Sequence, residues 1–156
     1  MKPIIVNIVL GFVIPWCFAI YLINKDKKVF LITFPFASML AFIVNQIGFQ
    51  FGYFLLIPVM NVKTFSSIFA NVGFYPILAS FMVYFIECCR FNRTLAIFAF
   101  TLITTFFEAI GIRIGYVHYG HGWNLIWTFF SYLIPYWLVV KYFALTTTIF
   151  QKSQSE

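Results

Sequence analysis

The chain has 156 residues, of which 63% are hydrophobic, 23% are aromatic and 9% are charged, and its formal net charge is +6. An ordinary soluble domain is roughly 45–50% apolar and about 25% charged, so this composition excludes a water-soluble globular fold and indicates an integral membrane protein. The positive charge does not indicate nucleic-acid binding, because the Lys and Arg residues lie singly or in short clusters between apolar runs, as they do in multi-pass membrane proteins.

The first apolar run covers residues 4–23. About 20 apolar residues are needed for a helix to cross roughly 30 Å of hydrocarbon, so this run predicts a span. A cleaved signal peptide carries its positive charge before the apolar stretch, whereas here Lys25, Lys27 and Lys28 follow it and Lys2 alone precedes it. The order of charges predicts a retained first helix whose amino end lies outside.

A second span is predicted over residues 29–47. It contains Pro35, which is tolerated in a spanning helix where neighbouring groups satisfy the freed carbonyl. The apolar run that follows, Phe51–Met60, is too short to cross a bilayer and contains Gly52 and Pro58. We expect it to be an interfacial or re-entrant segment.

Three further spans are predicted over residues 66–87, 94–112 and 124–145. No internal repeat and no linker divides the chain, so residues 1–150 are expected to form one domain, followed by a polar tail at 151–156. The predicted fold is an all-α integral membrane bundle of five transmembrane helices.

The distribution of Lys and Arg predicts the orientation of this bundle, because basic loops stay in the cytoplasm. One side of the membrane receives Lys2, Lys63 and Arg113. The other side receives Lys25, Lys27, Lys28, Arg90, Arg93, Lys141 and Lys152. We therefore expect a cell-membrane protein whose amino end lies outside and whose carboxyl end is cytoplasmic, with the 113–124 loop outside.

Polar side chains gather in the half of the bundle that this orientation places outside. Buried amides and carboxylates in hydrocarbon need hydrogen-bond partners, and they can supply these to one another. The candidate residues for such a set are Asn45, Gln46, Asn71, Thr105, Glu108, Arg113, His118 and His121. They predict an outward-facing polar pocket between the second, third and fourth helices and the loop after the fourth.

Glu108 is the central residue of this predicted pocket, because it lies inside an apolar helix and shares a helical face with Thr105. A carboxylate at such a depth costs about 2.5–3.5 kcal/mol on insertion scales and is a functional hypothesis by default. The alternative is a structural ion pair with Arg113, whose guanidinium also suits a lipid phosphate.

One alternative is that His118, His121 and Glu108 together bind a zinc ion, since two imidazoles and a carboxylate are suitable zinc ligands. However, Gly120 and Gly122 interrupt any helix that would fix its geometry, so polar loop residues within an interfacial aromatic belt are favoured. The cysteines, Cys17, Cys88 and Cys89, have neither an even count nor a metal-ligand spacing. We predict no metal, no other cofactor and no disulfide.

Three functions remain open for such a chain. The favoured one is the binding or passage of a small polar or amphipathic ligand at the pocket around Glu108. The alternative is a non-catalytic subunit or scaffold that meets other membrane subunits or further copies of itself. A membrane-embedded hydrolase or transferase comes third, and no catalytic residue is predicted. The double glutamate with an arginine four residues on, typical of prenyl-dependent intramembrane endopeptidases, is missing, since Phe107 precedes Glu108 and Arg113 follows five residues later.

Four short motifs, at residues 71–76, 107–108, 122–124 and 135–136, carry a family resemblance. They read Asn-Val-Gly-Phe-Tyr-Pro, Phe-Glu, Gly-Trp-Asn and Pro-Tyr. With them the second half of the chain resembles an uncharacterised family of small multi-helix membrane proteins of endospore-forming Gram-positive bacteria. The resemblance implies a bacterial cytoplasmic membrane and about five helices, and it implies no activity.

Overall fold

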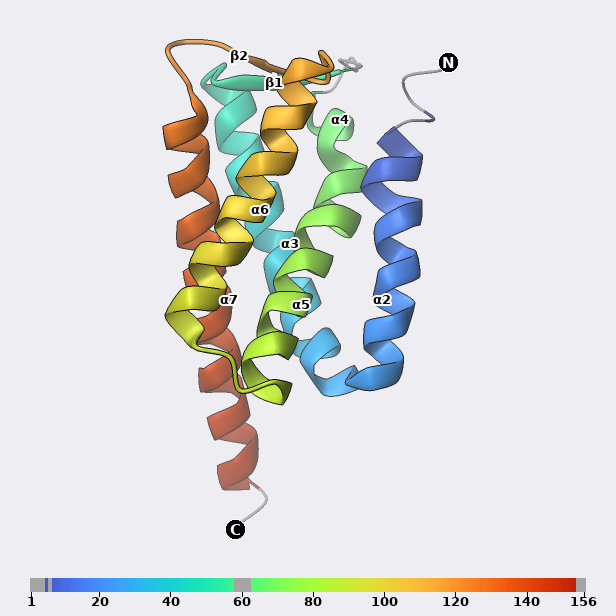
Figure 1. The fold of residues 1–156 in the computed structure, drawn as a ribbon, viewed down its shortest axis with the longest axis vertical. Coiled ribbons are helices and arrows are strands. Elements are labelled where there is room, and N and C mark those ends of the chain that lie inside the picture. Colours follow the sequence, from blue (N-terminus) through green and yellow to red (C-terminus); the bar gives the residue numbers. More distant parts are fainter. Residues whose placement is uncertain (1–4, 6, 58–62, 154–156) are drawn as a thin grey trace.

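The computed structural model describes residues 5, 7–57 and 63–153. In this part of the chain, helical rods run side by side and a small two-stranded sheet lies across one end of the bundle (Figure 1). In chain order the elements are η1 (Val9–Val13), α2 (Ile14–Lys25), α3 (Lys27–Gln50), β1 (Phe54–Leu56), α4 (Lys63–Phe69), η2 (Ala70–Phe74), α5 (Tyr75–Cys88), α6 (Arg93–Arg113), β2 (Val117–Tyr119) and α7 (Leu125–Ser153). The elements η1 and η2 are π-helical turns that continue into α2 and α5.

Four helices are long and apolar enough to cross a membrane. They are Lys27–Gln50, Phe65–Cys88, Arg93–Arg113 and Leu125–Lys152, and they confirm the last four predicted spans. The first helix, Val9–Lys25, is apolar but shorter. The helix α7 continues through Ser153, further than predicted, and it projects beyond the other rods at the carboxyl end (Figure 1).

Side-chain caps start two of these helices. Asp26 Oδ1 accepts a hydrogen bond of 2.9 Å from the main-chain N–H of Val29, and Asn92 Oδ1 accepts one of 3.1 Å from that of Leu95. Such N-caps satisfy donors that have no partner inside the helix. Both caps lie in tight turns at the same end of the bundle (Figure 1), so the sequence reverses direction there without a long loop.

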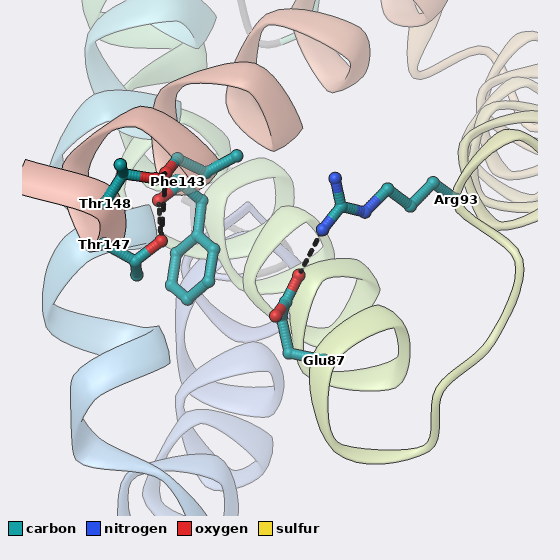
Figure 2. A network of polar contacts seen from close by, with 6 residues as sticks. Glu87, Arg93, Phe143, Thr147 and Thr148 are labelled. Carbon is teal, nitrogen blue, oxygen red and sulfur yellow. Dashed lines mark hydrogen bonds and ion pairs between the residues drawn. The ribbon is translucent and has the colours of Figure 1, made fainter. Parts of the chain in front are cut away.

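Figure 2 shows the polar contacts near the turn between α5 and α6. Arg93 and Glu87 form an ion pair of 3.4 Å, which is solvent-exposed and therefore contributes little stability. On α7 the hydroxyl of Thr147 donates to the carbonyl of Phe143, 2.9 Å away (Figure 2). Hydroxyls satisfied in this way by the preceding turn can face lipid at little cost.

The main apolar core lies between α3, α5, α6 and α7. Its most buried members include Ala79, Met82, Val83, Ala96 and Val139, all at most 2% exposed. Alanine in this set lets the helices approach closely, which is how helices associate when lipid removes the hydrophobic driving force.

The first helix (η1 and α2) packs against the third rod (α4, η2 and α5) where the two π-helical turns meet. A Cβ atom on Gly73 would overlap the main-chain oxygen of Gly11, so the two backbones are in direct contact there. Each π-helical turn is followed, two residues after its end, by a proline. This proline is Pro15 after η1 and Pro76 after η2. Proline has no N–H and so frees a carbonyl one turn earlier, which accounts for an irregular helix at both positions.

The strands β1 and β2 pair antiparallel, with Phe54 opposite Tyr119 and Leu56 opposite Val117. They join the loop after α3 to the loop after α6. Residues 51–57 therefore run across the end of the bundle (Figure 1), an arrangement that suits the interfacial alternative predicted for Phe51–Met60. A strand forms because the partner main chain of β2 satisfies its polar groups. Residues 58–60 of that segment lie outside the described residues.

Candidate functional site

Glu108 lies on α6 and is half-buried. Its carboxylate accepts hydrogen bonds from three hydroxyls. Tyr119 donates to Oε1 over 2.7 Å, Thr128 donates to Oε1 over 3.3 Å, and Tyr132 donates to Oε2. These partners come from β2 and α7, so the carboxylate joins three segments of the chain. Hydrogen bonds to an ionised acceptor contribute about 1.5–3 kcal/mol each, which is large enough to offset the cost of placing a carboxylate in the bundle.

The donors are themselves held in place by further hydrogen bonds. Trp123 Nε1 donates to Thr128 Oγ1 over 2.8 Å, and the hydroxyls of Tyr119 and Thr128 lie 2.6 Å apart. The hydroxyl of Tyr132 also lies 3.3 Å from that of Tyr75 on α5. The network therefore fixes the rotamers around Glu108 from several sides.

Tyr116 and Tyr119 lie in the loop outside the spans, and both remain neutral over the physiological range. Burial raises the pKa of Tyr116 to about 12. Burial and the neighbouring carboxylate of Glu108 raise the pKa of Tyr119 above its usual range. Tyr119 therefore keeps the proton that it donates to Glu108.

A groove of about 550 Å³ opens beside this carboxylate. Its walls come from η1 and α2 on one side and α6 on the other, and α5 forms its floor, in agreement with the position of α5 between these rods in Figure 1. The volume lies within the roughly 300–1,000 Å³ typical of small-molecule sites. Most of the lining is apolar, including Phe18, Leu78, Phe81, Phe100 and Phe107.

The lining of the groove changes along its length. Its polar side chains lie in the half nearer the sheet, called here its polar end, together with the apolar Leu56, Ile114 and Val117. Thr104, Tyr75, Tyr116 and Tyr132 line it near Glu108. Glu108 is five residues from the end of α6, or roughly 7–8 Å at 1.5 Å per residue. Towards the turn between α5 and α6 the lining is aromatic and aliphatic, so the shape and polarity suit a molecule with a polar head and an apolar chain.

Glu108 is the charged residue of this groove. Among the lining residues that the structure describes there is no Lys, Arg or His, and within the described residues the carboxylate forms no ion pair. Its hydrogen-bond partners are neutral hydroxyls. In its ionised form this carboxylate is solvated by dipoles, and no fixed cation balances it among the described lining residues.

Two further predicted residues of α6 lie near Glu108 without joining its hydrogen bonds. Thr105 donates instead to the carbonyl of Thr101, 2.8 Å away. Arg113 is exposed at the last residue of α6, and no ion pair with Glu108 is found in the described part of the chain. The side chain of Arg113 leaves the helix in a different direction because it is five residues from Glu108.

The two histidines lie in the loop at the sheet. His118 is exposed in β2, opposite Leu55, and His121 is exposed with a φ of 46°. His121 Nδ1 lies 2.8 Å from the carbonyl oxygen of Phe51, so its ring fastens the two loops together. Neither histidine lines the groove.

The predicted amides form a second, separate cluster between α3 and the third rod. Asn45 donates to Asn71, and Asn71 donates to the hydroxyl of Ser67 over 3.0 Å. Both amides are buried, whereas Gln46 is exposed on α3. A small cavity of about 40 Å³ lies between Asn45 and three tyrosines, Tyr75, Tyr132 and Tyr136, and most of its lining is apolar.

The structure places no cluster of three or more His, Cys, Asp or Glu side chains suited to a metal ion within its described residues. All three cysteines are exposed and unbonded to one another. Cys88 Sγ lies 3.5 Å from Asp26 Oδ2, at the end of the bundle opposite the sheet (Figure 1).

The contribution of α7 to the carboxylate network was not predicted from the sequence. Thr128, Tyr132 and Tyr136 follow one another at intervals of four residues and so share one face of the helix. Thr128 and Tyr136 are buried, and the hydroxyl of Tyr136 lies 2.6 Å from that of Thr104. A hydroxyl-bearing stripe inside an apolar span was the signal that could have identified these partners.

The fold and composition together define a multi-pass helical membrane protein with a half-buried carboxylate beside an apolar groove. Comparisons of the chain with protein-family models, with curated proteins and with solved structures found no match. The function is therefore inferred from the site itself.

Proposed function

We propose that this protein binds a small amphipathic molecule in the groove between α2 and α6. The polar head of the ligand lies at Glu108, Tyr132 and Tyr75, and its apolar chain extends along α5 towards the turn between α5 and α6. The observation that carries the proposal is the coincidence of a large apolar groove with one hydrogen-bonded carboxylate at its polar end.

The ligand reaches this groove from the bilayer. The wall formed by η1 and α2 contributes Leu10, Ile14 and Phe18, and each of these side chains is also exposed on the outer surface of the bundle. A groove bordered by such residues is in contact with acyl chains when the helices span a membrane. A molecule already dissolved in the membrane can therefore enter sideways.

The proposed orientation places the sheet and the polar end of the groove on the outer side. Lys25, Lys27, Arg90 and Arg93 belong to the turns at the opposite end of the bundle, and basic turns favour the cytoplasm. The head of the ligand then lies near the outer interface, where its polar groups are least costly to place.

Filling the groove tests this proposal. In phosphatidylcholine nanodiscs, the parent protein is expected to bind monododecanoylglycerol, a neutral single-chain amphiphile, with a measurable heat by titration calorimetry. Leu78→Trp places an indole on the floor of the groove and should weaken this binding at least tenfold. Leu102→Trp is the matched control, because Leu102 is on α6 and exposed outside the groove.

Empty nanodiscs give the partition of the amphiphile into lipid, which is subtracted from each titration. Equal binding by the parent, Leu78→Trp and Leu102→Trp would mean that the groove is not the binding site. Absence of binding to the parent by any single-chain amphiphile would overturn the proposal and favour a subunit or scaffold role for the same surface.

A further inference from the structure

Among the described lining residues of the groove there is one acidic side chain, Glu108, and no basic side chain to pair with it. The partners of Glu108 in the structure are the hydroxyls of Tyr119, Thr128 and Tyr132. A ligand with an anionic head would meet electrostatic repulsion here. A cationic head would supply the missing counter-charge in a medium of low dielectric, where such interactions are strongest.

We propose that the ligand class of this groove is the single-chain lipophilic amines, whose ammonium head binds the carboxylate of Glu108. This inference rests on the proposed function, and it adds the sign of the charge on the ligand. The ammonium N–H groups donate to the carboxylate oxygens, and the alkyl chain lies against the apolar lining along α5.

The aromatic side chains beside the carboxylate support a cationic head. Tyr75, Phe107, Tyr116 and Tyr132 line the groove close to Glu108. The negative faces of aromatic rings attract ammonium groups within about 6 Å. Hydroxyls of the same tyrosines also solvate a cation through their lone pairs, so the head of an amine finds acceptors on several sides.

The apolar lining of the groove also explains why the ligand needs an alkyl chain. The apolar end of the groove is lined by Phe81, Phe85 and Phe100, and the rings of Phe85 and Phe100 pack 6.2 Å apart. Each methylene buried there contributes favourable transfer free energy. A short amine such as ethylammonium leaves this part of the groove unfilled and is expected to bind far more weakly than a long-chain one.

The test compares three probes that share a dodecyl-length chain and differ in the charge of the head. They are dodecylammonium, the neutral monododecanoylglycerol and dodecyl phosphate, each titrated into parent protein in phosphatidylcholine nanodiscs at neutral pH, with empty nanodiscs subtracted. We expect dodecylammonium to bind at least tenfold more tightly than the neutral probe, and dodecyl phosphate to bind more weakly than either. Charge-assisted hydrogen bonds are about twice as strong as neutral ones, which gives this order.

Two variants test whether the carboxylate of Glu108 causes the preference for dodecylammonium over the neutral probe. Glu108→Gln keeps the shape of the side chain and removes its charge, so the preference for dodecylammonium over the neutral probe should fall to about twofold or less. Glu87→Gln is the matched control, because Glu87 pairs with Arg93 at the turn between α5 and α6 and does not line the groove. It should keep the full preference.

The outcomes separate this inference from the proposed function. Equal binding of the charged and neutral probes by the parent, with both weakened by Leu78→Trp, overturns the amine assignment and leaves the groove as a ligand site. No binding of any probe to the parent overturns both. A preference that survives Glu108→Gln shows that another group sets it and also overturns the assignment. The comparison of probes on the parent protein decides the question even where a variant fails to fold.

Discussion

The indole Nε1–H of Trp16 donates a hydrogen bond to the main-chain carbonyl of Val72, 3.0 Å away. Pro76 lies four residues after Val72 and has no N–H to offer that carbonyl. The first helix therefore supplies the hydrogen bond that the carbonyl of Val72 loses because of the proline in the third rod. This contact holds one wall of the groove against its floor, since Pro15 and Tyr75 beside it both line the groove.

Replacement of Trp16 by Phe should lower the free energy of unfolding by about 1–3 kcal/mol, the cost of leaving this partly buried carbonyl without a partner. A Phe ring keeps contacts with Phe30 and Phe34, which lie against the indole. The measurement is unfolding in mixed detergent micelles. Trp127→Phe is the control, since Trp127 is 57% exposed, and it should change stability by less than about 0.5 kcal/mol.

A methyl group at Gly73 should be more damaging than one at Gly11. In Gly73→Ala the new Cβ overlaps the main-chain oxygen of Gly11, whereas in Gly11→Ala the nearest atoms, Ala70 N and Phe69 Cβ, are 3.2 Å away. Overpacking of this kind costs about 1–3 kcal/mol. We expect Gly73→Ala to separate α2 from α5 and to lower the thermal midpoint clearly more than Gly11→Ala. Equal midpoints for the two variants would show that the backbones are not in contact.

Removal of Arg113 should leave the stability unchanged, although removal of Glu108 should not. Glu108→Ala leaves the hydroxyl of Tyr132 without its carboxylate acceptor, at a cost of about 1–3 kcal/mol. Arg113→Gln should stay within about 0.5 kcal/mol of the parent, because Arg113 is exposed. Both are measured by unfolding in mixed micelles. A similar loss in the two variants, and no further loss in the double variant, would establish the ion pair that the structure lacks.

Alkaline pH should destabilise the protein through its loop tyrosines. Burial raises the pKa of Tyr116 from 10.0 to about 12, so the folded protein keeps a neutral phenol that the unfolded chain would ionise. This contribution to stability is complete below pH 10 and is lost as the pH rises towards 12. In Tyr116→Phe the decline of stability with pH should be shallower than in the parent. Parallel declines would show that Tyr116 is not buried in solution.

The proposed orientation predicts which cysteine is reached from outside. In Cys17→Ser/Cys88→Ser, the remaining Cys89 is exposed at the turn between α5 and α6. A membrane-impermeant maleimide applied to intact cells should leave it unlabelled until the cells are permeabilised. In a variant in which all three cysteines are serine, His118→Cys should be labelled without permeabilisation, because His118 is exposed in β2. The reverse pattern would invert the bundle.

Hydropathy was sufficient to predict the four long spans, because each is a continuous apolar run of nearly the length that hydrocarbon requires. It could not predict β1, since the three residues Phe54–Leu56 become a strand only through pairing with a distant loop. The end of α7 also escaped prediction. Its threonines, Thr146 to Thr148, bond back to the preceding turn and allow the helix to continue.

The sequence was sufficient to locate the candidate site at Glu108, but not to predict which side chains surround it. Glu108 stands out as a carboxylate within an apolar run. Its partners depend on how α6 and α7 are rotated against each other, and helical periodicity alone does not fix that rotation. The groove depends on the approach of the first helix to the third rod at Gly11 and Gly73, which is a tertiary property.

The pairing of β1 with β2 has a consequence for the order of assembly. Membrane proteins are made from the amino end, so β1 emerges long before β2 and must wait, unpaired, until α6 has been synthesised. The last residue of β2 is Tyr119, which is also a donor to Glu108. Closing the sheet therefore brings the first hydroxyl donor to Glu108, and the other two, Thr128 and Tyr132, arrive with α7. The site acquires its final chemistry only when the loops have met and the last helix has packed.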